Sequence, residues 1–313
     1  MKHLLTIVFF MVFGKAFSQH SNKIFTSDID NFWIAYDQIQ KTDDHAEKLA
    51  FINKFYIDKG TPGLKAFMVA RNYNDSLYVK LIADHPNFWK SIKPNTLAVN
   101  SKMDELNRAV EKLKKLYPEL KDVAMYFTIG GLRSGGTVVD NMVLIGAEIA
   151  TGNPDTDMSD FKNDWLRNVF AKQSLDNIVY LNIHEYIHTQ QKGDRNRVMN
   201  ACIKEGSCDF MAELAMDKPI ETQYLIYGSA HADELKELFK QEMFSNNYFK
   251  WLFNGGKNVP CADLGYYIGY EICKSYYAHA SDKTRAIKEI IELDYDDDQA
   301  VESFLSKSKF FKE

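Results

Sequence analysis

Two histidines and a glutamate lie within one short segment of the sequence. Residues 181–188 read LNIHEYIH, which contains the pattern His-Glu-x-x-His. Residues four positions apart in a helix lie on one face, about one turn apart. His184 and His188 can therefore bind one Zn²⁺ ion together, while Glu185 points to the side and can deprotonate a zinc-bound water. The segment predicts a zinc-dependent hydrolytic site on a helix that Ser174 could cap.

A catalytic zinc ion needs a third protein ligand and one position left for water. Glu205 is the candidate, because it lies on the next predicted helix, residues 198–216. A turn near Gly193 would bring this helix back beside the first. Asp209, one helical turn after Glu205, would then accept a hydrogen bond from the remaining ring nitrogen of a zinc-bound histidine. The helix–turn–helix segment thus predicts both the third ligand and its supporting acid.

Two other residues compete for the position of third ligand. Asp194 would fit an extended pattern in which a glycine follows the second histidine by three positions, but Gln191 occupies that position. His231 could equally cap the helix predicted at 233–243 or contact a substrate. Glu205 is therefore the preferred ligand.

The elements that position these residues form a predominantly helical α+β chain. Residues 123–129, 137–140 and 142–149 are β-branched, aromatic or apolar and predict a small antiparallel sheet above the active helix. The sequence before and after these strands has helical periodicity. The predicted N-terminal helices are Asp28 to Gln40, Ala46 to Tyr56, Thr61 to Asn72 and Asn95 to Leu116.

The predicted regions are a helical N-terminal part, residues 19–121, and a zincin-like catalytic part, residues 122–313. With 313 residues, of which 45% are hydrophobic, the chain can bury a sizeable core and form one compact unit. The formal charge of −5 gives no basic surface for nucleic acid, so no nucleic-acid partner is expected.

The first eighteen residues predict a signal peptide cleaved near Ser18. Lys2 precedes an apolar run at positions 4–13, and small residues follow at Ala16 and Ser18. The protein is therefore expected to be exported, to the periplasm or beyond. No later apolar stretch is long enough to cross a bilayer, so no transmembrane segment is expected in the mature chain.

The four cysteines are expected to be structural or to form disulfides rather than to bind zinc. They occupy positions 202, 208, 261 and 273, and their spacing matches no Cys-x-x-Cys pattern. None lies near the cleavage point, so lipid attachment there is not expected.

The motif and its spacing resemble the gluzincin metallopeptidases, whose third zinc ligand is a glutamate on the following helix. More narrowly, HEYIHTQQ, KEGSCDFMAEL, WLFNG and DLGYYIGYEICKSYY resemble a family of predicted zinc-dependent proteases among exported bacterial proteins, with relatives among gliding-motility lipoproteins. The resemblance is best from Val123 to the end. The chain departs from it in lacking a lipid-attachment cysteine and in having Val259 where a basic residue is common.

The resemblance implies a sheet whose edge strand pairs with an extended peptide substrate. The last predicted strand, residues 141–149, is the candidate edge, and Gly146 and Glu148 within it are candidate substrate-binding residues that could recognise a free amine.

Gluzincins often use a tyrosine or histidine of a later helix to stabilise the oxyanion. Tyr267 and Tyr270 are the candidates here, with packing in the core as the alternative reading.

The sequence thus predicts an exported zinc metallopeptidase that acts on peptides or proteins. The alternative is a non-catalytic, metal-stabilised scaffold or binding protein, in which the same ligands close the zinc site. Hydrolysis of a non-peptide amide, such as a cell-wall fragment, is a third reading. The presence of Glu185 favours an enzyme, because a closed site has no use for a general base.

Overall fold

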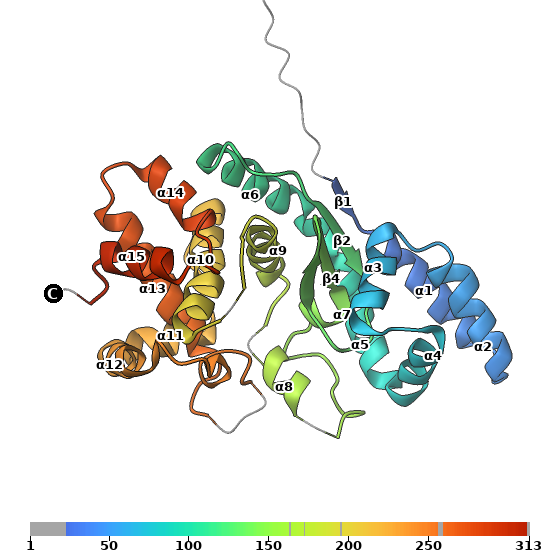
Figure 1. The fold of residues 1–313 in the computed structure, drawn as a ribbon. Coiled ribbons are helices and arrows are strands. Elements are labelled where there is room, and N and C mark those ends of the chain that lie inside the picture. The colour runs from blue at the N-terminus through green and yellow to red at the C-terminus, as the bar shows by residue number, and fades with distance from the viewer. Residues whose placement is uncertain (1–22, 163, 172, 195, 256–258, 312–313) are drawn as a thin grey trace, which may run out of the picture.

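The computed structural model describes residues 23–311 except 163, 172, 195 and 256–258. The chain is predominantly helical with one small sheet (Figure 1), which confirms the predicted α+β class. The strands are β1 (Lys23–Phe25), β2 (Ala124–Thr128), β3 (Gly136–Val139) and β4 (Met142–Gly146). The α-helices before the sheet are α1 (Ser27–Ile39), α2 (His45–Ile52), α3 (Pro62–Arg71), α4 (Asp75–Asp84), α5 (Pro86–Leu97) and α6 (Met103–Leu116). Those after it are α7 (Ala147–Ala150), α8 (Trp165–Phe170), α9 (Asn177–His188), α10 (Val198–Met216), α11 (Gln223–Ala230), α12 (Ala232–Glu242), α13 (Leu264–His279), α14 (Lys283–Ile291) and α15 (Asp298–Ser308). The described residues also include three short helical segments: the π-helix η1 (Asn53–Ile57) and the 3₁₀-helices η2 (Ala98–Lys102) and η3 (Tyr248–Lys250).

Several helix boundaries follow from local signals in the sequence. Helix α3 begins at Pro62, and the side chain of Thr61 accepts a hydrogen bond from the backbone N–H of Leu64, as a threonine cap before proline should. Helix α10 spans the predicted residues 198–216. The predicted helix from Asn95 to Leu116 is wrong in its first part, because α5 and η2 precede a shorter α6. The sequence reading also missed α4, and α9 begins after Ser174, which does not cap it.

The sheet is mixed, so the antiparallel sheet predicted from the sequence is wrong. Its strand order is β1-β2-β4-β3. Strand β2 runs parallel to both β1 and β4, and only β3 and β4 are antiparallel. The chain passes from β2 to the far side of the sheet, forms β3, and returns through a tight hairpin, so that β4 lies between β3 and β2.

This order places β3 at an edge of the sheet and β4 in its interior. The predicted edge, residues 141–149, is therefore wrong in position. It also ends early, because β4 stops at Gly146 and the chain continues as the short helix α7. A run that is apolar on both faces is typical of an interior strand, which explains the outcome.

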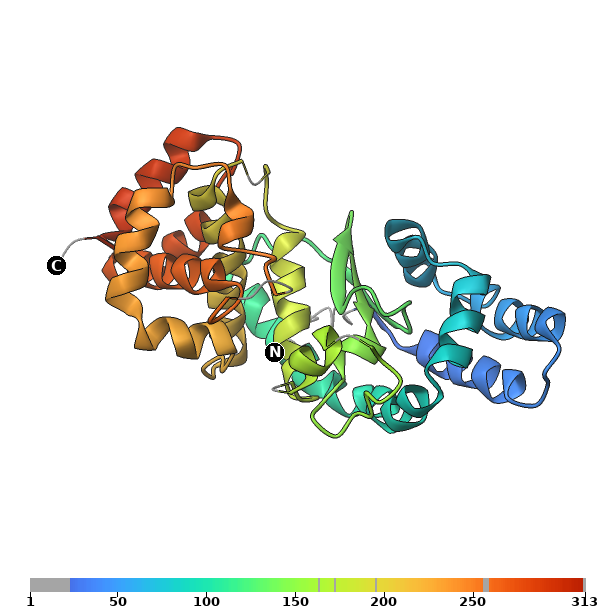
Figure 2. The same cartoon turned by 90° about the horizontal axis from the view of Figure 1, so that it is seen from below.

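The sheet separates two groups of helices (Figures 1 and 2). Helices α1 and α3 contact the sheet from the side of the N-terminal helices, whereas α9 contacts β3 and β4 from the other side. Helix α10 packs on α9, and α13 packs on α10. The layers thus place α9 between an edge strand and a second long helix.

Two glycines let α10 and α13 approach until their backbones touch. A Cβ atom on Gly269 would lie 1.7 Å from the carbonyl oxygen of Cys202, and one on Gly206 would lie 2.0 Å from the backbone nitrogen of Tyr270. Gly206 directly follows Glu205 in the chain. This contact fixes the helix that carries Glu205.

Two further sequence expectations concern cysteines and membrane segments. The thiols of Cys202, Cys208 and Cys273 are buried and form no disulfide within the described residues. Among the described helices, none has both the length and the apolar character that a bilayer span requires. The predicted signal peptide, residues 1–18, lies outside the described residues.

Candidate metal centre

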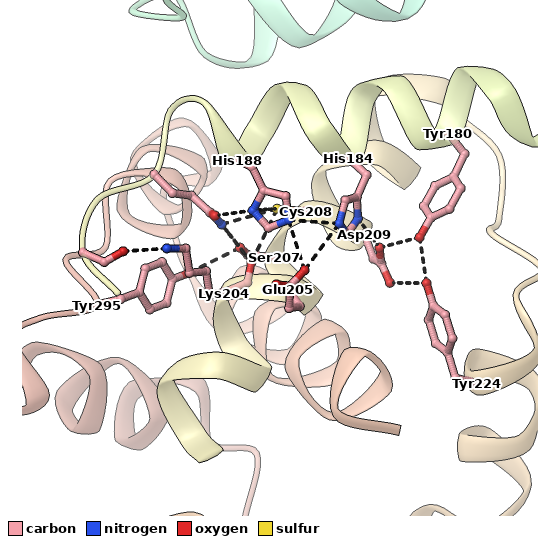
Figure 3. Close-up of polar contacts among 12 residues, drawn as sticks. Tyr180, His184, His188, Lys204, Glu205, Ser207, Cys208, Asp209, Tyr224 and Tyr295 are labelled. Atoms are coloured by element: carbon pink, nitrogen blue, oxygen red, sulfur yellow. Dashed lines mark hydrogen bonds and ion pairs between the residues drawn. The ribbon is translucent and has the colours of Figure 1, made fainter. Parts of the chain in front are cut away.

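Helix α9 presents two imidazoles side by side, one turn apart. The Nε2 atoms of His184 and His188 lie 3.1 Å from each other, and both rings point toward α10 (Figure 3). His184 is buried and His188 is largely covered. The His-x-x-x-His spacing therefore brings two nitrogen donors to one point below the helix.

Glu205 of α10 brings a carboxylate to the same point. Its Oε2 atom lies 3.0 Å from Nε2 of His188 and 3.5 Å from Nε2 of His184. The side chain is almost fully buried. The structure thus brings together the three residues that the sequence singled out as ligands.

The spacing of these three atoms matches what a zinc ion requires. Tetrahedral zinc bound to nitrogen and oxygen at about 2.0 to 2.1 Å holds neighbouring ligand atoms about 3.3 Å apart. The three observed separations, 3.0, 3.1 and 3.5 Å, lie around that value. Two imidazoles and one carboxylate also form a donor set that zinc accepts readily.

Cys208 is a second group within reach of the two imidazoles. Its Sγ atom, together with ring nitrogens of His184 and His188, forms a cluster whose atoms lie within 4.8 Å of one another. The sulfur, however, lies 3.4 Å from Nδ1 of His188, the nitrogen turned away from Glu205. Burial raises the pKa of this thiol well above its usual value, which keeps the sulfur neutral. Glu205 is therefore the better third ligand.

The charges of the cluster compensate one another. Burial raises the pKa of Glu205, but the nearby His188 and hydrogen bonds from both imidazoles outweigh it, so that the pKa lies well below its ordinary value. Burial lowers the pKa of His184, but hydrogen bonds to Asp209 and Glu205 outweigh it and raise the pKa to about 10. Without an ion the imidazole of His184 holds its proton against the buried carboxylates of Asp209 and Glu205, and a cation can replace the proton that faces Glu205.

Glu185 lies between α9 and the edge strand β3. The side chain is half-buried, and a Cβ atom on Gly136 would lie 3.0 Å from its Oε1 atom. Glycine at this position leaves room for the carboxylate, which stands beside the two imidazoles on α9 but does not join their cluster.

A comparison with protein families identifies the chain's relatives. The model described as gliding motility protein GldB matches residues 15–249, well over half of the chain. The chain belongs to the GldB family. This confirms the predicted relation to gliding-motility lipoproteins, and a lipoprotein family is compatible with an exported protein. No curated protein and no solved structure matched the chain.

In this GldB family member, the matched residues include all of α9 and α10. The cluster of His184, His188 and Glu205, together with Glu185 and Asp209, therefore lies within the part of the chain that matches the family model, and α13 lies beyond it.

Asp209 fixes the orientation of His184, as its position one turn after Glu205 predicted. Its Oδ1 atom lies 2.6 Å from Nδ1 of His184. The carboxylate also accepts hydrogen bonds from the hydroxyls of Tyr180, at 2.6 Å, and Tyr224, at 2.9 Å (Figure 3). If a cation displaces the proton on Nε2, the proton on Nδ1 stays shared with Asp209 and the lone pair of Nε2 is left facing Glu205, as metal binding requires.

Gln191 plays the corresponding part for His188, and the sequence reading missed it. Its Oε1 atom lies 2.8 Å from Nδ1 of His188. Its amide nitrogen donates to the carbonyl of Lys204 and the hydroxyl of Ser207, both at 2.8 Å. A glutamine three positions after the second histidine was the available signal, since it begins the turn that joins α9 to α10.

The alternative ligands predicted from the sequence lie elsewhere. Asp194 is exposed, and its backbone N–H donates to Asp296. Nδ1 of His231 hydrogen-bonds to the carbonyl of Tyr227, one turn earlier on α11. Neither belongs to the described cluster.

Gly146 and Glu148 do not lie at a substrate-accessible edge. Gly146 ends the interior strand β4, and a Cβ atom there would lie 2.4 Å from the carbonyl oxygen of Ser134. Glu148 is fully buried on α7 and accepts hydrogen bonds from the backbone N–H groups of Gly130, at 2.7 Å, and Leu132, at 3.2 Å. These contacts hold the glycine-rich loop before β3, which is a structural role.

Tyr267 and Tyr270 do not face the imidazoles. A Cβ atom on Gly228 of α11 would collide with the ring of Tyr267, and the hydroxyl of Tyr270 donates to Glu213 at 2.8 Å. Tyr266 faces the cluster instead, because its ring stacks on that of His184 with centroids 5.9 Å apart. Of the three tyrosines near the start of α13, the one beside the imidazoles is therefore not one of the two that the sequence analysis singled out.

The outer edge of β3 carries backbone groups that no described strand covers. In an antiparallel pair, alternate residues bond to the partner, and those between them point outward. The N–H of Gly146 donates to the carbonyl of Gly135. In this register the backbone groups of Thr137 and Val139 bond to β4, whereas those of Gly136 and Val138 point outward. The hydroxyl of Ser134 donates to the carbonyl of Gly136.

Proposed function

We propose that this chain is a zinc-dependent peptidase. The observation that carries the proposal is the convergence of three donor atoms from His184, His188 and Glu205, 3.0 to 3.5 Å apart, beside a half-buried glutamate that stands outside the cluster. Zinc, when bound, supplies a Lewis acid that polarises a carbonyl and lowers the pKa of a water molecule.

Glu185 is the proposed general base and acid. Its carboxylate, held against Gly136, would take a proton from the attacking water and return it to the nitrogen of the leaving amine. Asp209 and Gln191 would keep the Nε2 atoms of the two histidines turned toward Glu205 throughout. In this proposal the general base and two of the zinc ligands come from α9, while the third ligand and the supporting residues come from α10 and from the turn between the two helices.

Tyr266 replaces Tyr267 and Tyr270 as the proposed oxyanion donor. Burial, followed by the charge of Glu205, raises the pKa of Tyr266 well above its usual value, so its hydroxyl keeps its proton and can donate. Its stacking on His184 supports this assignment.

The proposed substrate is an extended peptide that adds to the edge of β3. The outward backbone groups of Gly136 and Val138 can bond to a peptide main chain without regard to its sequence. Gly136 also borders Glu185, so a peptide on this edge would pass beside the proposed general base.

The proposed place of action is outside the cytoplasm, in the periplasm or beyond. The lipoprotein character of the family supports this, as does the predicted signal peptide at residues 1–18.

The decisive experiment compares zinc content and peptide hydrolysis in four proteins. Wild type should hold about one zinc ion per chain and cleave a casein digest until a chelator is added. Glu185→Gln should keep its zinc and lose about a thousandfold in rate, because only proton transfer is removed. Glu205→Ala should lose both zinc and activity.

Asp194→Asn is the matched control, since this exposed acid was the alternative ligand; it should keep both zinc and activity. Two results would refute the proposal: cleavage by Glu185→Gln at the wild-type rate, or a wild-type protein that binds no zinc after incubation with excess zinc. A zinc-loaded wild type without hydrolysis would favour the non-catalytic scaffold.

A further inference from the structure

A row of aromatic rings leads from the surface to the proposed metal centre. Phe249 and Phe253 have ring centroids 6.3 Å apart, and Phe253 lies 6.4 Å from Tyr266. Tyr266 in turn stacks on His184 at 5.9 Å. The outer two rings are 50% and 44% exposed, whereas His184 is 6% exposed. The row is thus an apolar surface that is continuous with the site.

The segment that carries these rings is anchored on both sides of Phe253. Leu252 is fully buried, and a Cβ atom on Gly265 of α13 would lie 2.8 Å from its side chain. On the other side, the side chains of Asn254 and Asp263 each accept a hydrogen bond from the other residue's backbone N–H, at 2.8 and 3.2 Å. Phe253 is therefore held outward by its neighbours.

The backbone of Phe253 adopts a conformation that its side chain disfavours. Its φ angle is +56°, in the left-handed region that glycine and asparagine tolerate best. A phenylalanine in this backbone conformation strains the chain, and because the Phe253 ring is partly exposed, full burial does not offset that strain. Strain of this kind at a fixed, exposed side chain is a reason to look for a ligand.

We propose that Phe249, Phe253 and Tyr266 form a substrate subsite for a large apolar side chain, preferably aromatic, of a peptide bound beside the metal centre. This inference rests on the proposed peptidase function and specifies its substrate class. Stacked and edge-on ring contacts are available along the row, and a phenylalanine or tyrosine of the substrate would extend it. A lysine or aspartate at that position would leave its charge against apolar rings and be disfavoured.

The first test uses a random octapeptide library and zinc-loaded protein, with cleavage sites read by mass spectrometry. Wild type should enrich aromatic and large aliphatic residues at one position next to the cleaved bond. The double variant Phe249→Ala/Phe253→Ala should reduce that enrichment about fivefold, in line with the loss of two ring contacts. Phe244→Ala is the matched control, because Phe244 is equally exposed, stacks against Arg197 and does not belong to the row; its enrichment should equal that of wild type.

The second test measures binding alone, so that it does not depend on catalysis. The probes are two fluorescein-labelled octapeptides of alanine and serine, one with a central phenylalanine and the other with a central lysine. Zinc-loaded Glu185→Gln protein should bind the phenylalanine peptide several-fold more tightly, and the double substitution should remove that preference. Equal affinity for both peptides, or a preference that survives the double substitution, would overturn the subsite.

A third measurement separates ligand binding from a packing role. Phe253→Gly relieves the positive φ angle, so its midpoint of thermal unfolding should equal or exceed that of wild type while the peptide preference falls. A lowered midpoint with an intact preference would show that the ring serves only the fold. Cleavage without any aromatic preference would refute the subsite and leave the peptidase proposal standing. If wild type binds the phenylalanine peptide selectively but cleaves no peptide, the peptidase proposal is refuted and the subsite stands.

Discussion

At the scale of single residues, Asp209 serves three partners at once. One oxygen faces His184 and accepts from Tyr180, while the other accepts from Tyr224. These bonds engage both oxygens of the carboxylate and fix its plane, so the two tyrosines help to set the orientation of the imidazole without contacting the three proposed ligand atoms. Removing any one partner should therefore act on zinc affinity through His184.

Substitution of Asp209 tests this chain of contacts. Asp209→Asn replaces one acceptor oxygen by a donor, so it cannot satisfy all three partners, and zinc affinity should fall about 10- to 100-fold. Tyr224→Phe removes one hydroxyl and leaves the bond to His184, so its effect should be only a few-fold. Competition with a fluorescent zinc chelator measures both.

Tyr227→Phe provides the control on the same helix, because the ring of Tyr227 stacks on His231 and takes no part in the contacts of Asp209. Unchanged zinc affinity in Asp209→Asn would contradict the assigned role.

The sequence predicted the residues of the site where helical periodicity alone decides the geometry. His184 and His188 share one face of α9, and Glu205 and Asp209 share one face of α10, because the members of each pair are one helical turn apart. Gln191 was missed, since its contact depends on the path of the turn after α9. The identity of the inward tyrosine was also missed. Residues 266 and 270 lie on one face of α13 with 267 beside it, and helical periodicity does not say which of these rings reaches His184.

At the scale of elements, the contact between α10 and α13 determines where Glu205 stands. Gly206 follows Glu205 directly and touches the backbone of α13. The helix therefore has little freedom to move away from α13 or to turn about its axis, and either movement would draw the carboxylate away from the imidazoles.

Gly269→Ala should disrupt this contact. A methyl group would meet the backbone carbonyl of Cys202, which cannot turn away as a side chain could. We expect a loss of about 2 kcal/mol or more in the free energy of unfolding, measured in urea. Gly255→Ala is the control, because among the described residues its Cβ would meet nothing closer than Ala262 at 4.0 Å, and it should change stability by less than about 0.5 kcal/mol. Equal stability of the two variants would refute the role of the close contact.

The elements themselves were predicted unevenly. The boundaries of α10 were right, whereas β3 and β4 were assigned the wrong places in the sheet. Strand order depends on which strand the returning chain inserts beside, and a four-residue strand such as β3 carries too few side chains to reveal it. The three residues of β1 gave no signal at all.

At the scale of the whole molecule, Glu148 links the two halves of the fold. It lies on α7 beyond the sheet, yet its carboxyl binds the loop that leads into β3, and the tyrosines of the N-terminal helices surround it. Burial raises its pKa to about 7, although hydrogen bonds from Gly130 and Leu132 oppose the rise. The fold therefore carries a carboxyl group that titrates near neutral pH.

This raised pKa makes stability depend on pH in a defined direction. Between about pH 4.5 and 7 the folded protein keeps a proton that the unfolded chain has released, so raising the pH favours unfolding. The free energy of unfolding should fall by about 3 kcal/mol across that range from this group alone. Glu148→Gln should abolish this part of the slope.

The measurement is urea unfolding of wild type and Glu148→Gln from pH 4.5 to 7.5, with a chelator present so that metal binding does not contribute. The difference between their free energies of unfolding at each pH gives the contribution of this carboxyl group. Parallel stability curves for wild type and Glu148→Gln would show that the carboxyl group does not titrate in this range.

The parallel pairing of β1 with β2 has a consequence for the order of events during synthesis. Lys23 pairs with Ala124, about a hundred residues later in the chain. At about 5 to 20 residues per second, the ribosome needs roughly 5 to 20 seconds to deliver the partner strand. Throughout that interval β1 has no strand to join, so the sheet cannot be completed until helices α1 to α6, which lie between the two strands in the chain, have all been synthesised.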